Sequence, residues 1–149
     1  AALPHLARGA HITNISSLFG IIAPVGNATY SASKFGVRGF SMALRSELAP
    51  RGIGVTSVHP GGIRTAIAAS ARRGAGVSAA EWEVGQRAFE RFLVMDPAEA
   101  ARKIADGTVR RRPRVLIGTD AVAGDILARI APSGHAAVFE YIARKRAGL

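Results

Sequence analysis

Three short runs rich in β-branched and apolar residues alternate with helical patterns, and this alternation constrains the fold more than any other feature. Residues 11–16, 53–58 and 115–118 are the predicted strands. The longest helical pattern, residues 30–48, has the density of apolar residues typical of a helix buried on more than one side. Strands connected through helices form parallel sheets that are covered on both faces. The sequence therefore predicts an α/β fold.

The composition is that of an ordinary globular protein. Of the 149 residues, 48% are hydrophobic and 20% charged, which excludes disordered, collagen-like and coiled-coil chains. The absence of cysteine excludes a disulfide scaffold and thiol catalysis, and the histidines lack metal-ligand spacing, so no metal is expected. No apolar run is long enough to span a membrane, so we expect no membrane partner and a cytoplasmic location. No repeat or linker divides residues 1–149, which predicts a single unit without an internal boundary.

The chain is strongly basic, with 20 Lys and Arg residues against 10 Asp and Glu and a formal net charge of +10. A basic surface can bind nucleic acid. The densest cluster, from Arg110 to Arg114, has no interleaved aromatic residues on which bases could stack. Because a charge run usually forms a solvated face, we expect no nucleic-acid partner.

Two polar motifs follow predicted strands. Ser16 and Ser17 stand at the end of the first strand, and the turn Pro60-Gly61-Gly62 follows the second. In open parallel sheets, ligands bind outside the carboxyl ends of the strands. These motifs are therefore the first indication of a functional site.

Tyr30 and Lys34 are four residues apart in the predicted helix, so their side chains lie one turn apart on one face. A phenol is a poor proton donor or acceptor at neutral pH, but a neighbouring ammonium group stabilises the phenolate and makes it a usable general acid/base. Ser17 is then in a position to hydrogen-bond to a substrate oxygen. The plain alternative is a surface tyrosine beside a solvated lysine.

These residues belong to a set of motifs that occur together, in this order and spacing, in a known family. The motifs are Asn14-Ile15-Ser16-Ser17, Gly20, Tyr30-Ser31-Ala32-Ser33-Lys34, Val55-Thr56-Ser57-Val58-His59-Pro60-Gly61 and Thr65. In them the sequence resembles the short-chain dehydrogenase/reductase family. The resemblance is dense over residues 9–65 and continues beyond them only in the order of the elements. It implies a Rossmann-like, doubly wound parallel sheet, of which this chain would supply the last three strands and their helices.

The resemblance also implies a reaction, the transfer of a hydride between NAD or NADP and an alcohol/ketone substrate. Tyr30 would be the catalytic acid/base, Lys34 would stabilise its phenolate and bind the nicotinamide ribose, and Ser17 would polarise the substrate carbonyl. The residues implied to bind the cofactor are Tyr30, Lys34, Pro60, Gly61, Ile63 and Thr65. The full-length protein is expected to be a homo-oligomer, as is common in the family.

Other residues near the motifs have competing interpretations. Ser16 is the rival of Ser17, and the register of the family favours Ser17. His59 stands at a strand end, but the family pattern does not support a catalytic role for it. The later aromatic residues are candidates for either core or substrate pocket: Trp82, Phe89 and Phe92. A second set is predicted to form the opposite wall of an apolar substrate pocket: Leu18, Phe19, Ile22 and Val25.

The family's Gly-rich turn, which binds the pyrophosphate at a helix N-terminus, is not found in this sequence. Gly52-Ile53-Gly54 precedes a predicted strand, whereas the turn has to follow one. The residue that selects NAD or NADP is not found either. We therefore expect the chain to be the C-terminal catalytic portion of such an enzyme, with little or no dehydrogenase activity by itself.

Two other functions stay open. A family member with altered chemistry would be an epimerase or a dehydratase. A non-catalytic paralogue or a basic interaction module would bind without turnover. Salt dependence separates a basic interaction module from an enzyme. Binding to phosphate weakens steeply with salt, whereas binding in an apolar active site does not.

Overall fold

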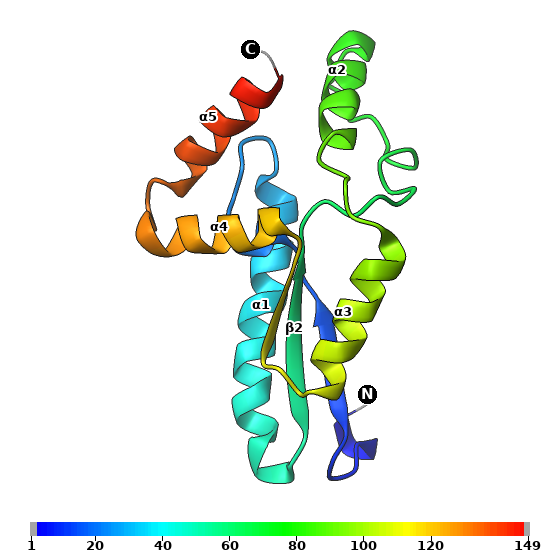
Figure 1. Cartoon of the computed structure of the whole chain (residues 1–149), viewed down its shortest axis with the longest axis vertical. Coiled ribbons are helices and arrows are strands. Elements are labelled where there is room, and N and C mark those ends of the chain that lie inside the picture. The colour runs from blue at the N-terminus through cyan, green and yellow to red at the C-terminus, as the bar shows by residue number, and fades with distance from the viewer. Residues whose placement is uncertain (1–2, 148–149) are drawn as a thin grey trace.

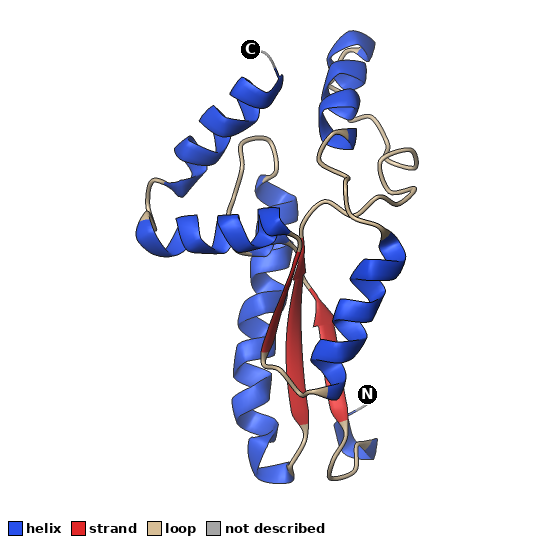
Figure 2. Ribbon diagram, in the orientation of Figure 1, coloured by secondary structure: helices blue, strands red, loops and turns tan. Residues whose placement is uncertain are grey.

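A parallel sheet of three strands forms the centre of the computed structural model, which describes residues 3–147 (Figure 2). β1 (His11–Ile15) and β3 (Arg114–Ile117) flank β2 (Gly54–Pro60). The helix α1 (Ala28–Leu48) lies on one face of the sheet and α3 (Pro97–Val109) on the other (Figure 1). The predicted α/β fold is confirmed, with strand boundaries displaced by one or two residues.

The sheet separates two apolar cores, because alternate residues of a strand point to opposite faces. On one face, Val55 is 1% exposed and packs with Leu44 and Leu48 of α1. On the other face, Val58 and Ile117 are fully buried in a cluster that includes a residue of α3. The strands are held in register by parallel pairing, in which Val58 lies between its partners on β1 and β3.

α1 is buried on one side only, contrary to the prediction. Its buried residues include two serines, Ser31 and Ser41, and two leucines near its end. Phe40 and Met42 are 60% and 50% exposed. The density of apolar residues in this helix therefore overstates how much of it is core.

The segment between the Pro-Gly turn and α3 forms one helix, whereas its glycines Gly74, Gly76 and Gly85 predict several short ones. α2 (Ala79–Glu90) begins at Ser78, whose side chain forms a reciprocal capping box with Glu81. Turns without a regular helix or strand precede it over residues 66–78. Figure 1 shows that α2 stands away from the sheet.

α3 begins where the run Asp96-Pro97-Ala98-Glu99 predicts a helix start. Asp can cap a helix, Pro suits its first position, and Glu three residues after the cap can complete a capping box. The Asp96 carboxylate accepts hydrogen bonds from the amides of Ala98 at 2.8 Å and Glu99 at 3.3 Å, and thereby caps the helix. The expected reciprocal bond from the Glu99 side chain does not form, since that carboxylate pairs with Lys103 at 2.7 Å. The helix start is confirmed, but its capping box is wrong.

The arginine cluster binds other parts of the chain and is only partly a solvated face. The Arg111 guanidinium donates to the carbonyls of Gly9 at 2.8 Å and Gly52 at 3.1 Å, beside the amino ends of β1 and β2. The backbone of Arg111 adopts a φ of 51°, a conformation that residues other than glycine rarely adopt. Arg110 pairs with Asp106 at 2.6 Å. Part of the basic charge is therefore used within the fold.

Two helices follow the sheet, α4 (Thr119–Ile130) and α5 (His135–Ala147). α4 packs near the carboxyl ends of the strands, where a third cluster of buried apolar residues includes Leu18 and Ile22. Over residues 3–147, no helix is both long enough and apolar enough to cross a membrane.

Candidate active site

Ser17 is the serine whose hydroxyl is available to a ligand. It follows β1, and its Oγ accepts a hydrogen bond from the Phe19 amide at 3.1 Å. None of the described residues accepts the hydroxyl hydrogen of Ser17. Ser16, by contrast, is 3% exposed and donates to the carbonyl of Lys34 at 2.8 Å. The geometry thus agrees with the preference for Ser17.

Tyr30 and Lys34 lie beside the segment that contains Ser17. Lys34 Nζ is 5.6 Å from the centroid of the Tyr30 ring and donates to the carbonyl of Ile15, the last residue of β1, at 3.3 Å. The Tyr30 ring packs edge-on against Phe19, with 6.0 Å between the ring centroids. Tyr30 is 44% exposed, and no described residue hydrogen-bonds to its hydroxyl. The phenol can therefore reach a bound ligand.

Gly20 allows the Ser17 segment to lie against α1. A Cβ atom at this position would be 2.7 Å from the carbonyl oxygen of Lys34 and would also overlap with Ser16 Oγ. Because the overlap involves backbone, it cannot be relieved by rotating a side chain. The glycine of the motif is thus explained by this close approach to the helix that contains Tyr30.

The loop after β2 can offer the Ile63 backbone amide and the Thr65 hydroxyl to a ligand. The amides of Gly61, Gly62 and Arg64 donate within the protein, at 2.8, 2.7 and 2.9 Å, to the Ile117 carbonyl, the Asp120 carboxylate and the Met95 carbonyl. No described residue accepts a hydrogen bond from the Ile63 amide. Thr65 Oγ1 accepts a long hydrogen bond of 3.5 Å from the Ile67 amide, so its hydroxyl hydrogen stays available.

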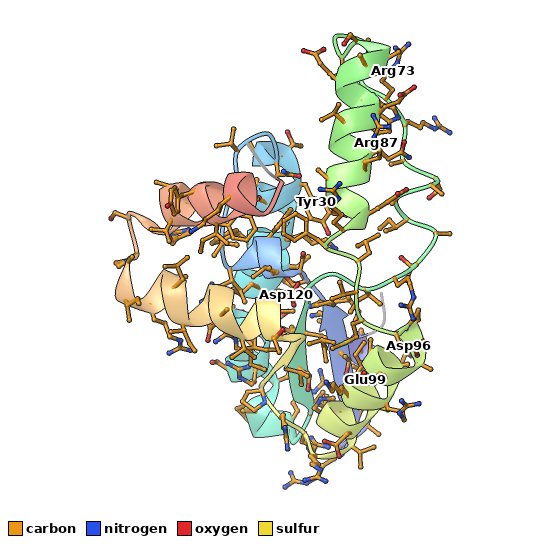
Figure 3. All side chains as sticks on the ribbon, turned by 45° about the horizontal axis from the view of Figure 1, so that its top comes forward. Tyr30, Arg73, Arg87, Asp96, Glu99 and Asp120 are labelled. Carbon is orange, nitrogen blue, oxygen red and sulfur yellow. The ribbon has the colours of Figure 1, made fainter. Side chains whose placement is uncertain are left out.

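Asp120 is a residue of the candidate site that the sequence patterns did not indicate. Its carboxylate holds the Gly62 amide from the first turn of α4, and Figure 3 labels it at the same end of the sheet as Tyr30. A Cβ atom on Gly61 would overlap with the carboxylate, so this glycine permits the close contact. The available signal was an acidic residue in the first turn after a strand, which alone is too common to select.

His59 is fully buried at the end of β2. Its Nδ1 lies 3.1 Å from the carbonyl oxygen of Ser17 and its Nε2 lies 3.0 Å from Ser57 Oγ. Burial, assisted by the charges of Arg114 and Arg38, lowers the pKa of His59 to about 4, against the opposing effect of its hydrogen bond to Ser17. A buried neutral imidazole does not contact substrate, in agreement with the sequence analysis.

Protonation of His59 should destabilise the fold. Because its pKa is about 4 in the folded chain and 6.5 for an unperturbed histidine, the unfolded chain takes up the proton first as pH falls. The stabilisation is therefore complete above pH 6.5 and is lost as pH falls toward 4, by an amount on the order of 3 kcal/mol. Urea denaturation at neutral pH and at about pH 4 measures it. The wild type should lose more stability than His59→Asn, and equal losses would contradict the assignment.

Of the predicted pocket residues, Trp82 and Phe89 line a cavity of about 290 Å³ that is formed by α2 and the segment before it. None of the residues predicted for the opposite wall lines this cavity, and neither do Ser17, Tyr30 and Lys34. Leu18 and Ile22, predicted to line the opposite wall, are 5% and 0% exposed in the core cluster near α4 and cannot contact substrate. The prediction for these two residues is wrong, because their side chains fill the space between the sheet end and α4.

The first half of the chain matches a known family. The model of the short chain dehydrogenase family aligns with residues 1–76, slightly more than half of the sequence. The chain belongs to this family. Residues 1–76, which the family model matches, include Ser17, Tyr30 and Lys34.

Individual members of the family match most of this chain, beyond the residues that the family model covers. SadH of Mycobacterium tuberculosis, provisionally classed as an oxidoreductase, is 45% identical over 140 residues, which are 91% of this chain and 50% of that protein. A Burkholderia phymatum short chain dehydrogenase/reductase solved with NAD has a TM-score of 0.70 and 22% identity over 85% of this chain and 48% of its own. A Burkholderia cenocepacia short chain dehydrogenase solved with NADP has a TM-score of 0.57 and 20% identity over 83% of this chain and 44% of its own. The chain spans about half the length of these proteins, and the two structures share its fold.

Proposed function

We propose that this chain is the catalytic part of an NAD- or NADP-dependent oxidoreductase that transfers a hydride between nicotinamide and an alcohol/ketone substrate. The observation that supports this best is the arrangement at the carboxyl end of the sheet. There the Ser17 hydroxyl is available to a ligand, and Phe19, two residues further on, packs against the Tyr30 ring. Lys34 stands one helical turn from Tyr30. The reaction class follows from this set together with the family.

The residues present fit a nicotinamide. Its carboxamide needs a hydrogen-bond donor and an acceptor, and the Ile63 amide and the Thr65 hydroxyl are the groups of the loop that can supply them. Pro60 and Gly61 would form the wall next to the ring. When bound, the nicotinamide supplies or accepts the hydride, and the protein provides position and charge.

The residues of the chain perform the proton transfer. In reduction, the Ser17 hydroxyl donates a hydrogen bond to the substrate carbonyl and the Tyr30 hydroxyl gives its proton to the same oxygen as the hydride reaches the carbon. In oxidation, the Tyr30 phenolate takes the proton from the alcohol. The Lys34 ammonium, 5.6 Å from the Tyr30 ring centroid, stabilises the negative charge that develops on the phenol and would bind the nicotinamide ribose.

We also propose that the chain needs a dinucleotide-binding half for turnover, as part of the same domain. The strand order places β1 at one edge of the described sheet, where a further parallel strand can pair. A substrate with an apolar body stays a prediction, because the cavity next to Trp82 and Phe89 is not lined by Ser17, Tyr30 or Lys34. A homo-oligomeric full-length protein and a cytoplasmic location stay predictions.

Ser17 and Ser16 form a matched pair for testing the assignment. In the full-length protein, Ser17→Ala should lower kcat by about a hundredfold or more, the usual cost of removing one donor to a developing oxyanion. Ser16→Ala should keep kcat within about threefold but lower the free energy of unfolding by about 1–3 kcal/mol, because it leaves the Lys34 carbonyl without this partner. Steady-state kinetics and urea denaturation measure both effects. The reverse pattern would assign the role to Ser16.

A further inference from the structure

The backbone pairing between β1 and β2 ends just before Ser17. Ile15 and Val58 are the last paired residues, and the Ser16 amide donates to the Val58 carbonyl at 2.8 Å. Beyond this point the contact between the two strands is made by a side chain. His59 Nδ1 reaches the Ser17 carbonyl oxygen at 3.1 Å and so continues the ladder by one step.

The partners of His59 fix which nitrogen holds the proton. A carbonyl oxygen can only accept, so Nδ1 must donate to Ser17. Nε2 is then the acceptor, and the Ser57 hydroxyl donates to it at 3.0 Å. Both nitrogens are used, and the ring is held in one orientation and one tautomer.

The surroundings of His59 hold the imidazole ring in this position. It is 0% exposed, and the charged groups that act on it are Arg38 of α1, Arg114 of β3 and Asp125 of α4. Arg114 in turn is bound by Asp125, with one contact of 3.1 Å. The imidazole is therefore enclosed between helices and sheet directly behind the Ser17 segment.

The contact with His59 completes the hydrogen bonding of the Ser17 carbonyl, which also accepts from the Gly20 amide at 3.0 Å. Held from two directions, this peptide group fixes the backbone that orients the Ser17 side chain. We propose that His59 is a positioning residue that aims the Ser17 hydroxyl at the substrate oxygen. The inference rests on the proposed role of Ser17 in hydride transfer.

Three substitutions at His59 separate this role from simple packing. In His59→Asn the amide nitrogen stands near the place of Nδ1 and can still donate to Ser17, whereas in His59→Gln it extends toward the place of Nε2 and the Ser57 hydroxyl. His59→Leu fills the space without either bond. In the full-length protein, Asn should keep kcat within about threefold of wild type, while Gln and Leu should lower it about tenfold, with the KM for the cofactor unchanged in all three. Equal kcat values for Asn and Gln would overturn the proposal.

If the variants fail to fold, a measurement on the wild type still tests the positioning role of His59. Nitrogen-15 NMR of the imidazole should show His59 protonated on Nδ1 at neutral pH, and a proton on Nε2 would overturn the proposal. Tyr30→Phe separates this inference from the function on which it rests. If Tyr30→Phe abolishes turnover but Asn and Gln behave alike, the positioning role alone fails. If Tyr30→Phe stays fully active, the proposed function fails.

Discussion

Replacing Tyr30 by phenylalanine in the full-length protein should lower kcat by about a thousandfold, within the range that a general acid/base contributes. The substitution removes the proton that the substrate oxygen needs and little else. The Tyr30 hydroxyl has no hydrogen-bond partner among the described residues, and the ring would keep its edge-on contact with Phe19, 6.0 Å between centroids. Stability should therefore stay near the wild-type value. Tyr30 is only one of the residues implied to bind the cofactor, so the dissociation constant of the cofactor should change far less than kcat.

The chain provides a matched control for this experiment. It has two tyrosines, and Tyr141 of α5 is 66% exposed. Tyr141→Phe makes the same chemical change at an exposed side chain that is not one of the proposed site residues, and it should leave kcat within about twofold of wild type. Steady-state kinetics with a saturating cofactor measures both variants. Full activity in Tyr30→Phe, or an equal loss in both variants, would remove the catalytic assignment.

The second large effect concerns cofactor binding. The 149-residue chain alone should bind NAD or NADP more than about a hundredfold more weakly than the full-length protein, a difference of roughly 3 kcal/mol or more. The loop around Ile63 can contact the nicotinamide end, but the Gly-rich turn that holds the pyrophosphate at a helix N-terminus is not found in the sequence. Most of the binding free energy of the dinucleotide should therefore be missing.

Isothermal titration of both proteins with each cofactor tests this expectation. Circular dichroism of the isolated chain is the control, because an unfolded chain would also fail to bind. Tight and saturable binding by a folded isolated chain would contradict the proposal that a separate dinucleotide-binding half is needed. The same titration of the full-length protein shows which of the two cofactors it prefers.

The arrangement of the proposed catalytic residues could be predicted from the sequence because their geometry is local. Tyr30 and Lys34 are four residues apart, and helix geometry alone places them on one face. Ser17 follows a strand, and the carboxyl ends of parallel strands meet at one edge of the sheet. The structure agrees with both expectations because they depend only on the identity of the elements, not on their exact boundaries.

The supporting residues could not be predicted in the same way. Asp120 binds the Gly62 amide, 58 positions away in the sequence, and His59 binds the Ser17 carbonyl, 42 positions away. Such pairs depend on the register between strands and on the direction of each side chain, which no local pattern encodes. The burial of Leu18 likewise depends on α4, which packs over it from the far end of the chain.

The basic charge illustrates the same limit. Composition could not distinguish a nucleic-acid surface from arginines that hydrogen-bond within the fold. Arg111 donates to the carbonyls of Gly9 and Gly52, and Arg114 pairs with Asp125. These contacts reduce the basic surface available to an anionic partner.

Hydride transfer itself is the most direct test of the account. The full-length protein should be incubated with NAD or NADP and a panel of secondary alcohols with apolar substituents, each deuterated at the carbinol carbon. Deuterium should move from the alcohol to the nicotinamide ring, none should exchange into water, and Tyr30→Phe should stop the transfer. Release of the deuterium into water, or conversion of the alcohol without labelling of the nicotinamide, would contradict the proposed hydride transfer.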